Sequence, residues 1–429
     1  MIDRGLVNFL RSMGIILVIF FHILYAVIQV LHKKYNPPET YSHIDKLISD
    51  FPNAFSLAFQ ALGSEIIFIF SGFLISYYLL CDVKEKGKID IYHYTVKRIS
   101  RIVPLYFIAV FLYGMGGDWD IYQLFLNLAF ISKIFNEKTI VPVGWSMEVT
   151  MQMYVVLPLL VILISRLKKE VGFFILCMII LVSLIPIFTN ISRITTYFYN
   201  VIYFPESINL AEKSIYYLAL YRSTPFLLGF LLSYILIHYQ ELVMKTFSGK
   251  KNKVLFLFIG IFLTIFAGNL PIQDRNSFIY NDIVPSDFWL YYSCIKRFTF
   301  SIGIIFVFLT FITSLKNKSS NLLIGIFQWE IWENISRSIF PIYLFHFIFI
   351  AISAVVVLGL QDFHIFYILF IDYDKKALYD LISISTLDVF TIFILSTSLS
   401  LIASNYIFLP IEDRCISAIT HVLIKNKKV

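Results

Sequence analysis

Two basic side chains stand out in the first hydrophobic segment, Arg11 and His22, which ten residues separate. Residues 13–31 contain only two strongly polar side chains, His22 and Gln29, and are long enough to cross a bilayer as a helix. Because a helix advances about 100° and ~1.5 Å per residue, His22 lies on the face of Arg11 and ~16 Å deeper, near mid-membrane. An ionisable group at this depth indicates a functional site unless it packs as a neutral imidazole against a neighbouring helix.

His22 is therefore a candidate functional residue, and an imidazole offers two kinds of chemistry. An imidazole has an unperturbed pKa of ~6.5, so it can accept a proton near neutral pH. Histidine can also act as a nucleophile and carry a covalent intermediate. The sequence leaves both mechanisms open.

A second hydrophobic stretch carries the carboxyl group of Glu65 and the hydroxyl of Ser71. A carboxylate inside a membrane needs a partner, which makes Glu65 a candidate for binding substrate. Ser71 is a second candidate, although it could instead bond to its own helix backbone or allow close packing beside Gly72.

Arg98 and Arg101 lie three residues apart, on one face of a helix, just before the third hydrophobic stretch. Guanidinium groups bind phosphates in bidentate fashion, so these two residues and Arg11 are candidates for holding a phosphorylated cofactor. The alternative is that the basic run only anchors the chain at the cytoplasmic face.

Two further segments place polar groups at membrane depth. Trp145 and Glu148 lie where the fourth hydrophobic stretch begins, and Tyr343 and His346 lie on one face inside the ninth. An aromatic ring offers an apolar platform while polar groups fix orientation, so all four are candidates for binding substrate. Trp145 could also belong to the aromatic belt of the membrane.

The composition predicts a polytopic membrane protein. Of the 429 residues, 59% are hydrophobic and only 15% charged, with a mean hydropathy of +0.79, whereas soluble domains have about 25% charged residues. We expect an all-α transmembrane bundle in which residues 1–429 form a single domain with no appended soluble domain. The expected spans, about ten, are roughly 9–30, 56–80, 102–114, 147–164, 171–189, 215–237, 254–270, 294–313, 338–359 and 381–410.

The positive charges predict that both termini are cytoplasmic. With this orientation, 22 of the 35 lysines and arginines fall in inner segments, 10 in outer segments, and the other three in or at the edges of spans. Trp119–Phe135 is too short for a further span and is expected to be interfacial or re-entrant. The first segment is too long for a signal peptide and lacks a cleavage site, so it is expected to remain as a helix.

The cysteines and the net charge indicate no further cofactor or partner. The four cysteines are widely scattered and form no pair or Cys/His cluster, so we expect neither a disulfide framework nor a metal site. In a membrane protein, the distribution of the net charge of +7 matters more than its sum, and no nucleic-acid partner is expected. The oligomeric state stays open.

Taken together, these motifs resemble the acyltransferase-3 family of integral membrane acyltransferases. The family has an Arg, ten residues, His motif, an acidic-x-Phe-Phe-x-x-Ser-Gly-Phe segment, an Arg-x-x-Arg-Ile-x-Pro run, a Trp-Ser-Leu-x-Val-Glu-x-Gln-Phe-Tyr helix start and a Tyr-Leu-x-His sequence. In this chain they correspond, in order, to Arg11 with His22, Glu65–Phe73, Arg98–Pro104, Trp145–Tyr154 and Tyr343–His346.

The resemblance implies a fold, a reaction and a location. It implies that His22 catalyses transfer of an acyl group, usually acetyl, from cytoplasmic acetyl-CoA or another acyl-CoA to a hydroxyl of a surface glycan or its lipid-linked precursor. The membrane is then the bacterial cytoplasmic (inner) membrane. A member that acylates a small lipophilic metabolite is an alternative, and a transporter or flippase of a lipid-linked glycan is a rival from another class.

Two positions depart from the family pattern. Thr150 occupies the place of the usual Glu, and the nearby Glu148 is two residues, or about 200° of helix, away from it. Near the end of the chain, the family's Glu-x-Pro sequence occurs as Pro410–Arg414, with Asp413 in place of the proline. The first departure leaves the role of Glu148 open.

Overall fold

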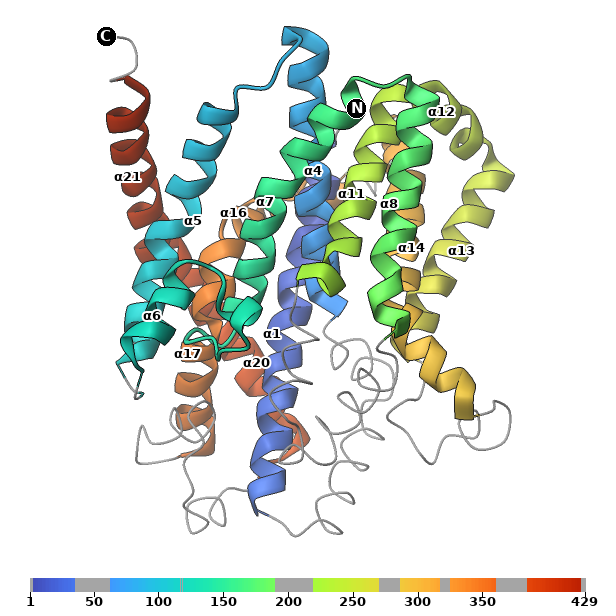
Figure 1. Ribbon diagram of the computed structural model, residues 1–429. Helices are drawn as coiled ribbons and strands as arrows, with labels where there is room; N and C mark the ends of the chain where they lie inside the picture. Colours follow the sequence, from blue (N-terminus) through green and yellow to red (C-terminus); the bar gives the residue numbers. More distant parts are fainter. Residues whose placement is uncertain are drawn as a thin grey trace. The chain divides into compact units, whose positions relative to one another are not determined.

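The computed structural model describes residues 3–34, 62–115, 117, 119–189, 219–269, 286–316, 325–359 and 384–425 (Figure 1). Within these ranges, every regular element is a helix and no strand occurs, which confirms the all-α class. Helices suit such an apolar chain because their backbone N–H and C=O groups bond within the segment and need no water.

Each of the ten expected spans overlaps a helix, although residues 56–61, 215–218, 270 and 381–383 of these spans lie outside the described residues. Among the described residues, seven helices are long and apolar enough to cross a membrane, or eight if the bent pair of α11 and α12 (Gln240–Ser248) is one span. A polytopic helical bundle is therefore confirmed, whereas the exact span count and the cytoplasmic termini stay predictions. The ten helices are α1 (Arg4–Lys34), α4 (Leu62–Lys86), α5 (Ile91–Gly114), α7 (Gly144–Ser165), α8 (Lys169–Thr189), α11 (Ala219–His238), α13 (Lys250–Asn269), α14 (Ser286–Lys316), α17 (Ile339–Leu358) and α20 (Thr386–Ala403).

The stretch Trp119–Phe135 forms two short helices, α6 (Ile121–Leu128) and η1 (Ser132–Phe135), neither of which could cross a bilayer. Asp120 caps α6, because its carboxylate accepts a hydrogen bond from the backbone N–H of Gln123. Asn127 ties α6 to the loop that follows, since its amide donates to the Lys138 carbonyl and accepts from the Ile140 N–H. The interfacial or re-entrant position of the stretch Trp119–Phe135 stays a prediction.

The described helices group into two compact units. Unit 1 takes residues from 1–14, 62–91 and 148–336, and unit 2 takes residues from 15–61, 92–147 and 337–429. Helices α1 and α7 contribute residues to both. Each unit is described by itself below, and the single membrane domain stays a prediction.

In unit 1, α4 and α11 lie side by side (Figure 1). They pack through two glycines. A Cβ atom added at Gly72 would lie 2.2 Å from the carbonyl oxygen of Phe226, and one added at Gly229 would lie 2.0 Å from that of Ile69. Small residues let membrane helices approach so closely that their backbones touch. Phe308 of α14 packs edge-on against α4, which adds a third helix to this core.

In unit 2, aromatic contacts join α1 to α20, and a hydrogen bond joins α5 to α17. The ring of Phe20 on α1 lies 6.3 Å from that of Phe390 and 5.1 Å from that of Phe393, both on α20, and α20 in turn packs against α17. The hydroxyl of Tyr113 on α5 donates a hydrogen bond to the backbone carbonyl of Leu344 on α17. These contacts fix the part of α1 that carries His22 relative to α17.

Candidate active site

The two intramembrane histidines contact each other within unit 2. The Nε2 atom of His346 on α17 lies 2.8 Å from the Nδ1 atom of His22 on α1, and their ring centroids are 4.8 Å apart. His346 is fully buried and His22 is half-buried. The structure therefore brings together two residues that are 324 positions apart in the chain.

The backbone of α17 determines which nitrogen of each ring carries a proton. The Nδ1 atom of His346 lies 2.8 Å from the Tyr343 carbonyl oxygen and 3.3 Å from that of Ile342, and a carbonyl can only accept. Both rings are neutral in this arrangement, because a buried imidazolium is costly in a membrane. His346 therefore carries its proton on Nδ1, and its Nε2 accepts a hydrogen bond from the Nδ1–H of His22.

This chain of hydrogen bonds leaves the lone pair of His22 on Nε2, the ring nitrogen that faces away from His346. A base whose orientation is set by a third group is the arrangement used in nucleophilic and general-base catalysis. The ring of Phe347 lies 4.5 Å from that of His22 and 4.6 Å from that of His346, and forms an apolar wall on the pair. The site is therefore suited to moving a proton without holding a permanent charge.

Tyr343 contributes to this site through its backbone. Its carbonyl oxygen is the closer acceptor for His346, while its side chain is buried. A direct contact of the Tyr343 side chain with substrate, as the sequence suggested, stays a prediction.

Arg11 lies in unit 1, on the same helix as His22 but in its first part. Its Nη1 donates a hydrogen bond of 3.0 Å to the hydroxyl of Ser336 on α16 (Glu330–Arg337). Next to it, the Ser12 hydroxyl donates to the Trp332 carbonyl of the same helix. Helix α16 therefore positions Arg11, which the sequence did not indicate.

Arg98 and Arg101 both have protein partners within unit 2. The Nε of Arg101 lies 3.1 Å from Oε1 of Glu412 on α21 (Leu409–Thr420), and its side chain is still 40% exposed. The guanidinium of Arg98 lies 5.5 Å above the ring of Tyr94. Binding of a phosphorylated cofactor by these two arginines stays a prediction.

The departure at Asp413 adds an exposed ion pair. Its Oδ2 accepts from Nη2 of Arg337 at 2.7 Å. Glu412, the neighbouring residue, points its carboxylate to Arg101 instead. The segment therefore makes an acidic contact to α5 through Glu412 and a second, exposed contact through Asp413.

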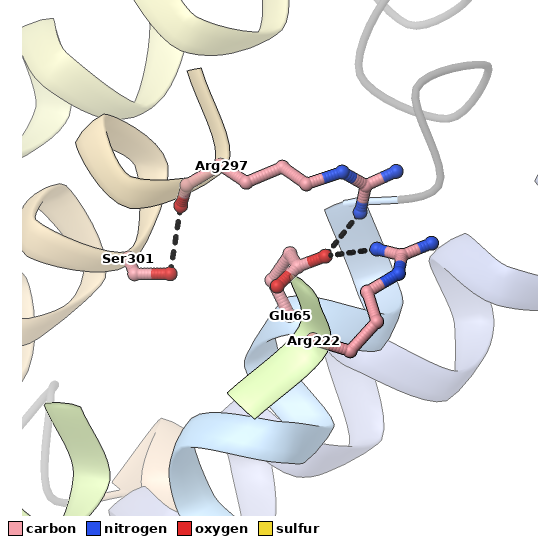
Figure 2. Close-up of polar contacts among 4 residues, drawn as sticks. All are labelled: Glu65, Arg222, Arg297 and Ser301. Atoms are coloured by element: carbon pink, nitrogen blue, oxygen red, sulfur yellow. Dashed lines mark hydrogen bonds and ion pairs between the residues drawn. The ribbon is translucent and has the colours of Figure 1, made fainter. Parts of the chain in front are cut away.

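Glu65 lies in a buried ion cluster in unit 1 (Figure 2). Its Oε1 accepts hydrogen bonds from Nη1 of Arg222, at 2.8 Å, and from Nη1 of Arg297. The side chains of Glu65 and Arg222 are 1% and 2% exposed, and that of Arg297 is 14% exposed. The expectation that this carboxylate needs a partner is confirmed, and the partners are two arginines.

Sequence reasoning missed these arginines although a signal was present. The three basic residues that the charge count leaves in or at the edges of spans are Arg222, Lys296 and Arg297. Basic residues inside apolar helices are functional candidates for the same reason as Glu65. What the sequence lacked was any indication that α11 and α14 would lie against α4.

The remaining candidates lie on α4 and α7. Helix α7 begins at Gly144, as the Trp145 motif predicted. Glu148 is 1% exposed and Thr150 is also buried, so the Glu148 carboxylate does not lie on the surface of the protein. Ser71 on α4 and Trp145 on α7 are half-buried, and their contact with substrate stays a prediction.

Comparison with known proteins identified a family. The model of the acyltransferase-3 family, described as an acyltransferase domain, matches residues 5–405. No curated protein and no solved structure matches the chain. The match includes all five motifs, from Arg11 to His346.

Proposed function

Because the chain belongs to the acyltransferase-3 family and is a multi-pass membrane acyltransferase, we propose that it is an O-acetyltransferase of a surface polysaccharide. The donor is acetyl-CoA, or another acyl-CoA, in the cytoplasm. The acceptor is a hydroxyl of the glycan or of its lipid-linked precursor, in the bacterial inner membrane. The observation that carries this proposal is the hydrogen-bond chain that leaves a lone pair on His22.

In the proposed reaction, Nε2 of His22 takes the proton of the acceptor hydroxyl while the oxygen attacks the thioester carbonyl. The carbon–sulfur bond of acetyl-CoA breaks, the thiolate of CoA leaves, and the proton on His22 neutralises it. The products are the ester and CoA, and the histidine is restored. His346 is a positioning residue, because it holds the His22 ring with Nε2 unprotonated.

The same lone pair supports the covalent alternative. Nε2 of His22 would then attack the thioester and release CoA, and the acyl group would pass from the imidazole to the hydroxyl. Both routes need the neutral ring that His346 orients.

Binding of the two substrates is assigned to separate groups. Arg98 and Arg101 are proposed to contact the phosphates of CoA at the cytoplasmic face, and Arg11 is a separate candidate for the same role. Trp145 and Glu148 are proposed to contact the sugar, with Ser71 and Tyr343 as further contacts. A small lipophilic metabolite is the alternative acceptor.

The test is transfer of label by the purified full-length protein in lipid nanodiscs. The protein is incubated with radiolabelled acetyl-CoA, with and without crude envelope glycan. We expect label in the glycan for the wild type and for His421→Ala, a control in which an exposed histidine is replaced, and none for His22→Ala. Equal transfer by His22→Ala would refute the role of His22, and the lack of any transfer by the wild type would favour a transporter.

A further inference from the structure

Glu412 on α21 is a buried carboxylate that the proposed reaction does not use. Its side chain is 4% exposed, whereas that of the next residue, Asp413, is 55% exposed. Its Oε1 forms the ion pair with Nε of Arg101, and within the described residues its Oε2 receives no hydrogen bond. A buried carboxylate is costly unless a cation compensates it. Glu412 therefore depends on Arg101.

A second contact holds the end of the chain that carries Glu412 against α5. The hydroxyl of Tyr92, near the start of α5, donates a hydrogen bond of 2.7 Å to the backbone carbonyl of Leu423 in η5 (His421–Lys425). The later residue of α5, Arg101, thus meets the earlier residue of the C-terminal segment, so the two segments are antiparallel. Figure 1 shows α5 and α21 side by side. The place of Glu412 relative to α5 is therefore fixed by more than the ion pair.

This part of unit 2 is expected at the cytoplasmic face. The continuous helical stretch Thr386–Leu423 has 38 residues, whereas about 20 residues cross the hydrocarbon core of a bilayer. Part of this stretch therefore projects beyond the core, and with the predicted cytoplasmic C-terminus that part includes α21. The same side is the one on which acyl-CoA arrives in the proposed reaction.

The ion pair uses only one edge of the Arg101 guanidinium. Its Nε faces Glu412, whereas its two Nη amino groups have no acceptor within the described part of the chain, and the side chain is 40% exposed. A phosphate binds a guanidinium through two parallel N–H···O bonds. With Nε occupied, the pair of Nη groups is the edge that can make both bonds.

We propose that Glu412 is a positioning residue of the acyl-CoA site, which holds Arg101 by Nε and leaves both Nη groups to bind a phosphate of CoA. This inference rests on the proposed function, in which Arg101 contacts the donor. Glu412 acts through Arg101 and does not touch the cofactor, because its own carboxylate is buried.

Two other interpretations of the same contact give different expectations. In the first, the Glu412 carboxylate competes with phosphate for Arg101, so its removal would tighten CoA binding. In the second, the ion pair only docks α21 on α5, so its removal would lower the thermal unfolding midpoint without changing CoA binding. Positioning requires instead that the place of the acceptor oxygen, rather than its charge, determines the affinity for CoA.

Two substitutions of Glu412 separate the place of the oxygen from its charge. Glu412→Gln keeps an oxygen that accepts from Nε but removes the charge, so CoA should bind within about threefold of the wild type. Glu412→Asp keeps the charge but withdraws the oxygen by a methylene group, so CoA should bind about tenfold more weakly. Asp413→Asn removes the charge of the exposed neighbour and, as the matched control, should bind CoA as the wild type does.

Binding of free CoA, which carries no acyl group to transfer, is measured by isothermal titration calorimetry on the full-length protein in nanodiscs. The thermal unfolding midpoint of each variant is recorded alongside, so that affinities are compared among folded proteins. In the transfer assay, Glu412→Asp should raise KM for acetyl-CoA by a similar factor and leave kcat unchanged, because the His22–His346 pair is intact. Simple destabilisation of the protein would not separate these two constants.

The outcomes that contradict the inference differ from those that contradict the proposed reaction. Tighter binding of CoA by Glu412→Gln, unchanged binding by Glu412→Asp, or an equal loss in Asp413→Asn would each overturn the positioning role. If the wild type binds no CoA, the proposed donor is refuted and this inference with it. If Glu412→Asp binds CoA and transfers label as well as the wild type, only the present inference is refuted.

Discussion

The two buried polar clusters of this protein differ in charge: one is neutral and the other is ionic. The His22–His346 pair in unit 2 stays uncharged and ends on backbone carbonyls, so its hydrogen bonds use every proton that the two rings have. The Glu65 cluster in unit 1 keeps three full charges, one negative and two positive. A neutral chain can pass a proton on at low cost, whereas the charges of an ion cluster hold one another in place. The difference predicts catalysis in the first cluster and a contribution to stability in the second.

Of the replacements that test this comparison, His22→Ala should have the largest effect, and the quantity affected is the rate of acyl transfer. His22→Ala removes the base while the helix becomes easier to insert, so acyl transfer should fall by about 10²–10⁴-fold at normal expression. The measurement is glycan acetylation by NMR in cells that express the variant, with protein quantified in isolated membranes. Near-normal acetylation would refute the catalytic role of the His22–His346 pair.

Replacement of Glu65 should mainly affect stability. Glu65→Ala leaves two buried arginines without their shared carboxylate, which should destabilise the folded protein by about 3–5 kcal/mol. Thermal unfolding of the variant in nanodiscs, compared with Ser71→Ala on the same helix as control, measures this loss. A thermal unfolding midpoint equal to that of Ser71→Ala would show that the Glu65 carboxylate does not stabilise the folded protein.

The next prediction concerns His346, whose effect should be on kcat rather than on binding. His346→Ala leaves His22 free to carry its proton on either nitrogen, so kcat should fall by roughly 10–10³-fold with little change in KM. His346→Gln should restore part of kcat, because its amide oxygen can accept from the Nδ1–H of His22 while its N–H₂ group can donate to backbone. A loss equal to that of His22→Ala would instead indicate that both histidines react with substrate.

Smaller effects are expected at the proposed CoA site. Arg98→Ala and Arg101→Ala should each weaken acyl-CoA binding by roughly ten- to a hundredfold, with partial rescue by Arg→Lys, since an ammonium lacks the bidentate fork. Lys97→Ala, an exposed neighbour on α5, is the matched control. If all three variants bind acyl-CoA like the wild type, the basic run serves only membrane orientation.

The smallest effect is expected at Glu148, and it tests whether this buried carboxylate also binds substrate. Glu148→Gln keeps the size of the side chain, so KM for the glycan should rise by several-fold if the carboxylate contacts the sugar. Thr150→Glu should not rescue this variant, because the two positions are about 200° apart on α7. Full acetylation by the Glu148→Gln strain, measured by NMR, would exclude a required role for this side chain.

The sequence alone was sufficient for the helices and for the polar residues that they bury. Hydropathy over about 20 residues determines a membrane helix locally, so all ten expected spans overlap helices. The depth of His22 and the cost of a lone carboxylate at Glu65 follow from the same local rule. The family motifs, each confined to a few residues, also needed no tertiary information, and the match over residues 5–405 confirms the family.

Only the tertiary structure decided which residues pair with Glu65 and with His22. Glu65 needed a counter-ion, yet Arg222 and Arg297 lie 157 and 232 positions away, and nothing local relates them to it. The protonated nitrogen of His22 depends on a carbonyl of α17 that is reached through His346. Hydrophobic periodicity specifies which face of a helix is buried but not which helix covers it. That choice is made by close packing, as at Gly72 and Gly229, where two backbones touch and place Arg222 beside Glu65.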